Sequence, residues 1–204
     1  MTDTTLLPPP GGTLTHGPTV IGLDTSLTAT GIASSLGWCE SVGYKPHHKK
    51  DAITTQPHVQ RLQSLLGVLG DVILAVGNPD LVVLESPSLA SLGGGGHERA
   101  WLWWEVYRSL TAHEIPVALM APSQRMLYAT GKGSATKSAV VDAAARRWPA
   151  WTTGGDDNQA DAVVLMAAGR DYLDHPIAVM PAANRAALTK AVWPDGIRTM
   201  GAAR

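Results

Sequence analysis

The pattern of apolar and polar positions divides the chain into short apolar runs and longer segments with helical periodicity. The short runs predict strands, because an uninterrupted apolar run bounded by turn residues is typical of a strand buried in a sheet. The predicted strands cover residues 20–24, 31–36, 38–44, 80–85 and 115–120. The first three are separated only by short turns, so they are predicted to form an antiparallel meander. Apolar residues at helical spacing predict helices over 58–76, 97–113, 135–148, 159–173 and 182–192.

This order of elements predicts an α/β fold in which helices flank a five-stranded mixed sheet on both sides. The chain has 204 residues, 45% of them hydrophobic, which fits one domain with a substantial core. The proline-rich residues 1–18 are expected to be a flexible N-terminal tail. Residues 19–175 are expected to form the domain, and residues 176–204 a C-terminal helix and tail.

Charge and composition restrict the partners of the chain. Sixteen Lys and Arg residues against 17 Asp and Glu give a net charge of -1, so any nucleic-acid surface must be local. A single cysteine, Cys39, excludes an internal disulfide and a cysteine-rich zinc site. Apolar runs stay below the roughly 18 residues of a membrane span, and the N-terminus does not resemble a signal peptide. These features predict a cytoplasmic protein with no membrane partner.

Three acidic residues lie where an apolar run ends or begins. Asp24 and Glu85 close predicted strands, and Asp161 opens an apolar helical segment. Each one taken alone can be a surface acid at the end of an element, and Asp161 also suits the first turn of a helix. Together they place three carboxylates at the edge of a buried core, where an uncompensated charge is costly. The set therefore predicts a metal site.

Several short motifs around these acids occur in a fixed order. They are Gly22-Leu23-Asp24-Thr25-Ser26 followed by Thr30-Gly31, then Arg61-Leu62, Pro79-Asp80, Leu84-Glu85, Thr130-Gly131-Lys132-Gly133-Ser134-Ala135-Thr136-Lys137 and Ala160-Asp161-Ala162. In this order they resemble the RuvC family of Holliday junction resolvases, within the ribonuclease H-like superfamily, over residues 20–169. The resemblance implies a ribonuclease H-like fold and a homodimeric, metal-dependent endonuclease. Such an enzyme resolves four-way DNA junctions by paired symmetric nicks.

Phosphodiester hydrolysis explains why carboxylates from separate elements would be needed. Two Mg²⁺ ions about 3.5 to 4 Å apart can activate a water and stabilise the leaving oxygen, and Mn²⁺ is a possible substitute. Asp24 would bridge both ions, with Glu85 on one and Asp161 on the other. The resemblance leads us to expect a fourth ligand three residues before Asp161, where this chain has Asn158. Either Asn158 or the neighbouring Asp157 can supply it, unless residues 156–158 serve only to cap the helix.

Positive charge flanks the glycine-containing loop at residues 131–135. Lys132 and Lys137 can bind phosphate there together with the backbone N–H groups of a helix start, and Lys137 is also a candidate catalytic residue. The loop nearly matches a nucleotide-binding P-loop, but Thr136 stands where that motif needs glycine, which disfavours an NTPase. Arg61 and Arg125 are further candidates for DNA binding.

Aromatic residues are concentrated in the predicted helix at 97–113. Trp101, Trp103, Trp104 and Tyr107 occupy more than one face of it, so some are expected in the core and the remainder in a homodimer contact. The loop after Glu85 departs from the family, because residues 86–89 contain no aromatic side chain, although glycines follow at 93–96. This departure leaves the preferred substrate open.

Three other functions are compatible with parts of the pattern. The chain can be a broader nuclease for flaps or forks, or a non-catalytic DNA-binding protein of the same fold. An actin-like sugar kinase is disfavoured, because the chain is short for two such lobes and lacks a second glycine-rich phosphate motif.

Overall fold

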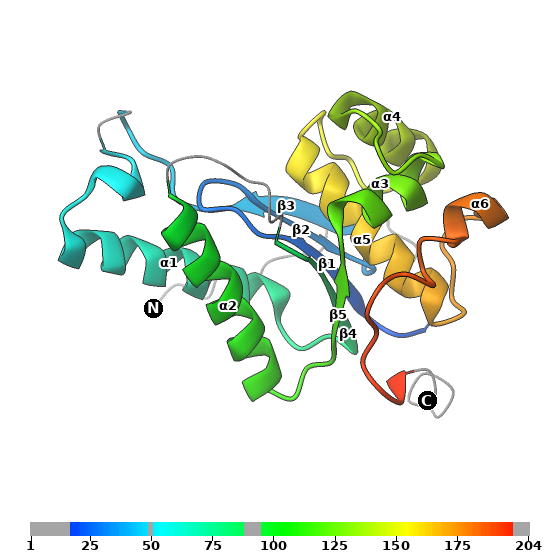
Figure 1. Cartoon of the computed structure of the whole chain (residues 1–204), viewed down its shortest axis with the longest axis horizontal. Helices are drawn as coiled ribbons and strands as arrows, with labels where there is room; N and C mark the ends of the chain where they lie inside the picture. Colours follow the sequence, from blue (N-terminus) through cyan, green and yellow to red (C-terminus); the bar gives the residue numbers. More distant parts are fainter. Residues whose placement is uncertain (1–16, 49–50, 88–94, 198–204) are drawn as a thin grey trace, which may run out of the picture.

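The computed structural model describes residues 17–48, 51–87 and 95–197 (Figure 1). The predicted N-terminal tail lies almost entirely outside these residues, as do residues 88–94 of the loop after Glu85 and the end of the predicted C-terminal tail.

The centre of the molecule is a five-stranded mixed sheet in the order β3-β2-β1-β4-β5. Strands β1 (Val20–Asp24), β2 (Thr30–Ser34) and β3 (Trp38–Val42) form the antiparallel meander that the sequence predicts. Strands β4 (Leu81–Glu85) and β5 (Val117–Met120) continue the sheet in parallel with β1. The register aligns Leu23 with Leu84, so Asp24 and Glu85, the last residues of β1 and β4, lie side by side at the same end of the sheet.

Helices cover both faces of the sheet (Figure 1). Helices α1 (His58–Val76) and α2 (Gly96–Ala112) pack on one face and enclose a core that includes Leu65, Val72 and Val106. The other face carries α3 (Pro122–Thr130), α4 (Lys137–Arg147), α5 (Asp157–Tyr172) and the single turn of α6 (Ala182–Arg185). The predicted five-stranded mixed sheet with helices on both sides is therefore confirmed.

Helix α5 is the central element of its layer. Its residues from Ala160 to Asp171 are all buried, because the sheet lies on one side and α3 and α4 on the other. Two glycines allow this close packing. A Cβ atom added to Gly22 would lie 2.0 Å from the carbonyl oxygen of Ala162, and one added to Gly31 would lie 2.0 Å from that of Asn158. Side chains at these positions would push α5 away from the sheet.

Among the described helices, only α1 is long and apolar enough to cross a membrane. Its buried residues, Leu65, Val68, Val72 and Val76, contribute to the core beneath the sheet, which accounts for part of its apolar character. Val59, Leu62, Leu66 and Leu74 are exposed on the other side of the helix.

The structure differs from the prediction at two elements. Helix α3 was not predicted, because Pro122 ends the preceding apolar run and its role as the first residue of a helix is not visible from that run. The predicted helix over 182–192 is wrong beyond its first turn. Val192 instead pairs with Leu119 through backbone hydrogen bonds of 2.8 and 2.9 Å, which covers the outer edge of β5.

Candidate metal and nucleic-acid site

The three predicted acids converge from three elements. Asp24 and Glu85 end the adjacent parallel strands β1 and β4, and Asp161 lies in the first turns of α5, which crosses those strands. Asp161 is buried, with 6% of its surface exposed, whereas Asp24 and Glu85 are partly buried. The register of β1 and β4 explains the proximity of the first two acids. The close approach of α5 at Gly22 and Gly31 brings the third to them.

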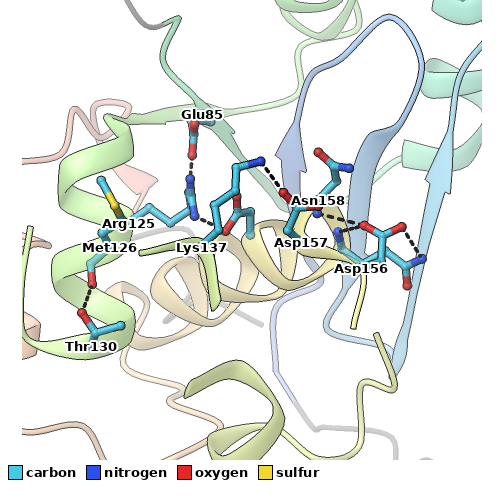
Figure 2. A network of polar contacts seen from close by, with 10 residues as sticks. Glu85, Arg125, Met126, Thr130, Lys137, Asp156, Asp157 and Asn158 are labelled. Carbon is cyan, nitrogen blue, oxygen red and sulfur yellow. Dashed lines mark hydrogen bonds and ion pairs between the residues drawn. The ribbon is translucent and has the colours of Figure 1, made fainter. Parts of the chain in front are cut away.

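Arg125 of α3 lies among these carboxylates. Its Nε atom donates to Glu85 Oε2 (Figure 2). Its Nη1 atom donates to Asp161 Oδ1, and its side chain is buried. The predicted role of Arg125 in DNA binding stays a prediction. Its guanidinium is an internal partner of two of the predicted metal ligands.

The site is electrostatically unfavourable for ionised acids. Burial raises the pKa of Asp24 to about 8, with further contributions from Glu85 and Asp161, while Arg125 and Lys137 act in the opposite direction. Burial also raises the pKa of Asp161 to about 7 and raises that of Glu85, although Arg125 lowers both. For Arg125 itself, the neighbouring Glu85 and Asp161 outweigh burial and raise the pKa. One arginine only partly compensates three carboxylates, so an additional cation would stabilise the site.

The oxygen donors of this site are of the kind that Mg²⁺ prefers, since all three are carboxylates. Within residues 17–48, 51–87 and 95–197, however, no three acidic, histidine or cysteine side chains are already arranged around one metal position. Arg125 accounts for this, because it binds Glu85 and Asp161 at the same time. The three carboxylates are suitable ligands for a divalent cation. Arg125 limits how many of these carboxylates can bind the same ion.

The two candidates for a fourth ligand have other contacts. Asp157 is paired with Lys137, the first residue of α4 (Figure 2). The side chain of Asp156 caps α5 by accepting from the N–H groups of Asn158 and Gln159 at 2.9 and 3.1 Å. Capping thus falls to Asp156, and the pairing of Asp157 with Lys137 leaves the side-chain amide of Asn158 as the candidate without a charged partner.

The two lysines predicted to bind DNA are both exposed. Lys137 is 79% exposed at its side chain and lies close enough to lower the pKa of Asp24, Glu85 and Asp161. Lys132 is exposed in the loop between α3 and α4. A cavity of about 640 Å³ opens next to Lys137 and Asp157, between α4 and the loop that contains Gly154. Positive charge and open space therefore adjoin the acidic cluster.

Arg61 is placed differently from the other candidates for DNA binding, which are Arg125, Lys132 and Lys137. Its Nη1 atom donates to Glu98 at 2.9 Å, and its Nη2 atom donates to the carbonyl oxygens of Thr54 and Gln56 at 2.8 and 3.0 Å. These bonds join α1 to α2 and to the short 3-10 helix η2 (Ile53–Thr55). Arg61 thus has a structural role that accounts for its position without DNA.

The sequence contained one signal for the role of Arg125. Within α3, Arg125, Tyr128 and Ala129 share the buried face at helical spacing. A charged residue on a buried face requires a partner. Because α3 was not predicted, that requirement could not be recognised.

Comparison with solved structures identifies proteins with a similar fold. The structure is similar to Thermus thermophilus RuvC, with a TM-score of 0.52 and 17% sequence identity over 80% of this chain and 99% of that chain. T. thermophilus RuvC in complex with a Holliday junction substrate matches with the same values. No family model and no curated protein matches the sequence. The chain thus has a RuvC-like, ribonuclease H-like fold.

Proposed function

We propose that the chain is a Mg²⁺-dependent endonuclease that resolves four-way DNA junctions in the cytoplasm, acting as a homodimer that makes paired symmetric nicks. The observation that carries this proposal is the convergence of Asp24, Glu85 and Asp161 at the carboxyl edge of two parallel strands. The RuvC-like fold supports it, since one similar structure contains a Holliday junction substrate.

In the proposed reaction, the three carboxylates hold Mg²⁺ and the lysines bind DNA. The metal, when bound, activates a water and stabilises charge on the leaving oxygen. Asp24 has the central position, because both other acids raise its pKa. Lys137 and Lys132 contact backbone phosphates next to the acids, and Lys137 is close enough to act at the cleaved phosphate itself.

The exposed apolar residues on the α1 and α2 layer support the homodimer. Trp104 is 62% exposed on α2, and Val59, Leu62 and Leu66 are between 50% and 73% exposed on α1. Large apolar side chains left exposed on the helices of one layer are typical of a contact surface.

Replacement of Asp24 tests the catalytic proposal. Asp24→Asn should reduce Mg²⁺-dependent cleavage by about 100-fold or more while junction binding persists, because it removes a metal ligand and leaves the lysines in place. The measurement compares cleavage of labelled four-way, three-way, flap and linear DNA. Asp174→Asn is the control, since Asp174 is exposed in the turn after α5. Near-normal cleavage by the Asp24 variant would refute the proposal.

Replacement of the lysines tests the DNA surface. Lys132→Ala and Lys137→Ala should each weaken DNA binding and reduce the slope of log K against log salt by about 0.9, the value for one phosphate contact on duplex DNA. Binding is measured by fluorescence anisotropy over a series of salt concentrations. Lys190→Ala, at an exposed position near the C-terminus, is the matched control. Unchanged slopes in both lysine variants would place the interface elsewhere.

A non-catalytic DNA-binding protein is the second candidate, and the position of Arg125 specifically favours it. An arginine bound to two of three metal ligands neutralises part of the charge that would attract a cation. DNA binding without cleavage in Mg²⁺ or Mn²⁺ on every substrate would favour this function. Cleavage confined to flaps or forks would favour a broader branched-DNA nuclease.

A further inference from the structure

We propose that Arg125 takes the place of one of the two metal ions, so that the site binds a single divalent cation beside a permanent guanidinium. This inference rests on the metal site of the proposed function. It replaces the expectation of two ions per site. Arg125 would then be part of the site in every state of the protein.

The position of Arg125 is the first reason. Its guanidinium contacts Glu85 and Asp161 simultaneously, which are the residues expected to hold one ion each (Figure 2). The guanidinium bridges carboxylates from β4 and α5 and neutralises part of their charge, as a metal ion between the same two elements would. With Arg125 in this position, Asp24 and the second carboxylate oxygens of Glu85 and Asp161, which Arg125 does not contact, would be left to hold one ion.

The charge balance is the second reason. Asp24, Glu85 and Asp161 carry three negative charges when ionised, and Arg125 supplies one positive charge in contact with two of them. One divalent cation completes neutrality. A second would leave an excess of two positive charges in a partly buried site, which is costly until a phosphate enters.

The anchoring of α3 is the third reason, because it fixes the backbone from which the Arg125 side chain extends to the acids. At the start of the helix, the side chain of Gln124 accepts from the N–H group of Ala121 at 2.8 Å and donates to the carbonyl oxygen of Lys190 at 2.7 Å. At its end, Asn184 donates to the carbonyl oxygen of Tyr128 at 2.8 Å. Both ends of α3 are thus bound to the C-terminal segment.

The guanidinium also retains donors for substrate. Arginine has five N–H donors, and the two bonds to the carboxylates use Nε and Nη1. Among the described residues, Nη2 makes no hydrogen bond that would occupy it. It can therefore donate to a phosphate oxygen placed beside the carboxylates, which is the contact that the second ion would otherwise make.

Manganese binding tests the inference without any need for cleavage. Mn²⁺ is titrated into metal-free protein in the absence of DNA, and electron paramagnetic resonance measures both the bound ions per chain and any spin coupling between neighbouring ions. The wild type should bind one Mn²⁺ per chain with an uncoupled signal. Arg125→Met, which removes the charge and keeps much of the side-chain volume, should bind two and show a coupled pair.

Two further variants complete the design. Arg108→Met is the matched control, because Arg108 is 65% exposed and pairs only with Glu105 of its own helix within the described structure, and it should bind one ion. Arg125→Lys keeps the charge and should also bind one. If Arg125→Met does not fold, the wild type and Arg125→Lys decide the question. Two ions in either protein would overturn the inference.

The remaining outcomes separate this inference from the proposed function. Two coupled ions in the wild type would overturn the role of Arg125 and leave a metal-dependent nuclease intact. A single ion in a folded Arg125→Met protein would also overturn it. No bound Mn²⁺ in the wild type would remove the metal site itself, and with it the inference and the proposed enzyme.

Discussion

Asp24 occupies a position that is unfavourable for folding when the metal is absent. Its carboxylate is surrounded by protein, and Glu85 and Asp161 add negative charge next to it. Arg125 forms ion pairs with the other two acids, so it stabilises the negative charge of Asp24 only by electrostatic attraction without direct contact. Carboxylates with strongly raised pKa values are concentrated at functional sites, because folding alone would favour a neutral side chain there.

The raised pKa of Asp24 predicts how the stability of the metal-free protein depends on pH. The pKa of this group is about 8 in the folded chain against an ordinary value of 3.8, so the folded state binds the proton more tightly than the unfolded state. The contribution of this proton to the free energy of unfolding is complete at low pH and is lost as the pH rises toward 8. The free energy of unfolding should therefore fall by roughly 2 kcal/mol between about pH 5 and pH 8, after solvent screening is considered.

Denaturant unfolding in the presence of a chelator measures this dependence. Asp24→Asn should show a smaller decrease, because its amide does not titrate. Saturating Mg²⁺ should stabilise the wild type more at the higher pH, where the ligands are ionised. A wild-type stability that is constant or rises over this range would contradict the assigned environment of Asp24.

The positions of the three acids could be predicted from the sequence, whereas the partners of Arg125 could not. Asp24 and Glu85 close apolar runs, and a strand boundary is a local property that the residues themselves reveal. Arg125 is 40 residues from Glu85 and 36 from Asp161 in the chain. Its contacts depend on how α3 packs against α5, which no local pattern encodes.

Helix α5 shows how a whole element is positioned by residues on another. The helix is buried around most of its circumference, so it has no polar face to orient it. Gly22 and Gly31 determine its distance from the sheet, because its backbone contacts theirs directly. The strands therefore control where Asp161 lies relative to Asp24.

Substitution of Gly31 should disturb this packing. Gly31→Ala would place a methyl group 2.0 Å from the carbonyl oxygen of Asn158, so the start of α5 must shift. We expect a loss of about 1–3 kcal/mol in the free energy of unfolding, together with weaker metal binding. Gly70→Ala is the control, because no atom lies within 4 Å of the added Cβ, and it should stabilise α1 by about 0.4–1 kcal/mol. Equal stability of both variants would show that α5 is not held by this contact.

The elements with strong periodicity were predicted well, and those without it were not. Helix α1 has the predicted bounds, and the strands differ from the prediction by one or two residues at half of their ends. Helix α3 has only nine residues and begins at a proline, which is a turn signal as often as a helix start. The segment after α6 has alanines and leucines typical of a helix. Its pairing of Val192 with Leu119 depends on the tertiary position of β5.

The molecule presents different surfaces on its two helical layers. The α3 to α5 layer carries Asp161 and the lysines above the strand ends with Asp24 and Glu85, and the α1 and α2 layer carries exposed apolar side chains. Trp103 links α2 to the sheet, because its indole N–H donates to the backbone carbonyl oxygen of Glu85 at 2.8 Å. A contact made through α2 therefore lies directly behind one of the proposed metal ligands.

Substitution of Trp104 tests assembly. Trp104→Glu should give a folded monomer that nicks junctions without making paired cuts, because a charge in the centre of an apolar contact prevents association. Sedimentation velocity measures the assembly state, and cleavage of a cruciform plasmid distinguishes nicking from resolution. Val179→Glu is the control, since Val179 is 97% exposed outside the α1 and α2 layer. Paired cuts by the Trp104 variant, or a wild type that remains monomeric on junction DNA, would refute the homodimer.

The wide separation of the acids along the chain has a consequence for biosynthesis. Asp24 lies on the first strand to be made, and Asp161 lies on a helix that emerges only after all five strands. A ribosome-bound or truncated chain that ends before α5 lacks a proposed ligand and the central helix that packs on that face of its sheet. Under the proposed function, the ability to cut DNA arises only on completion of the domain. Fragments left by interrupted translation or proteolysis would then be harmless to the chromosome.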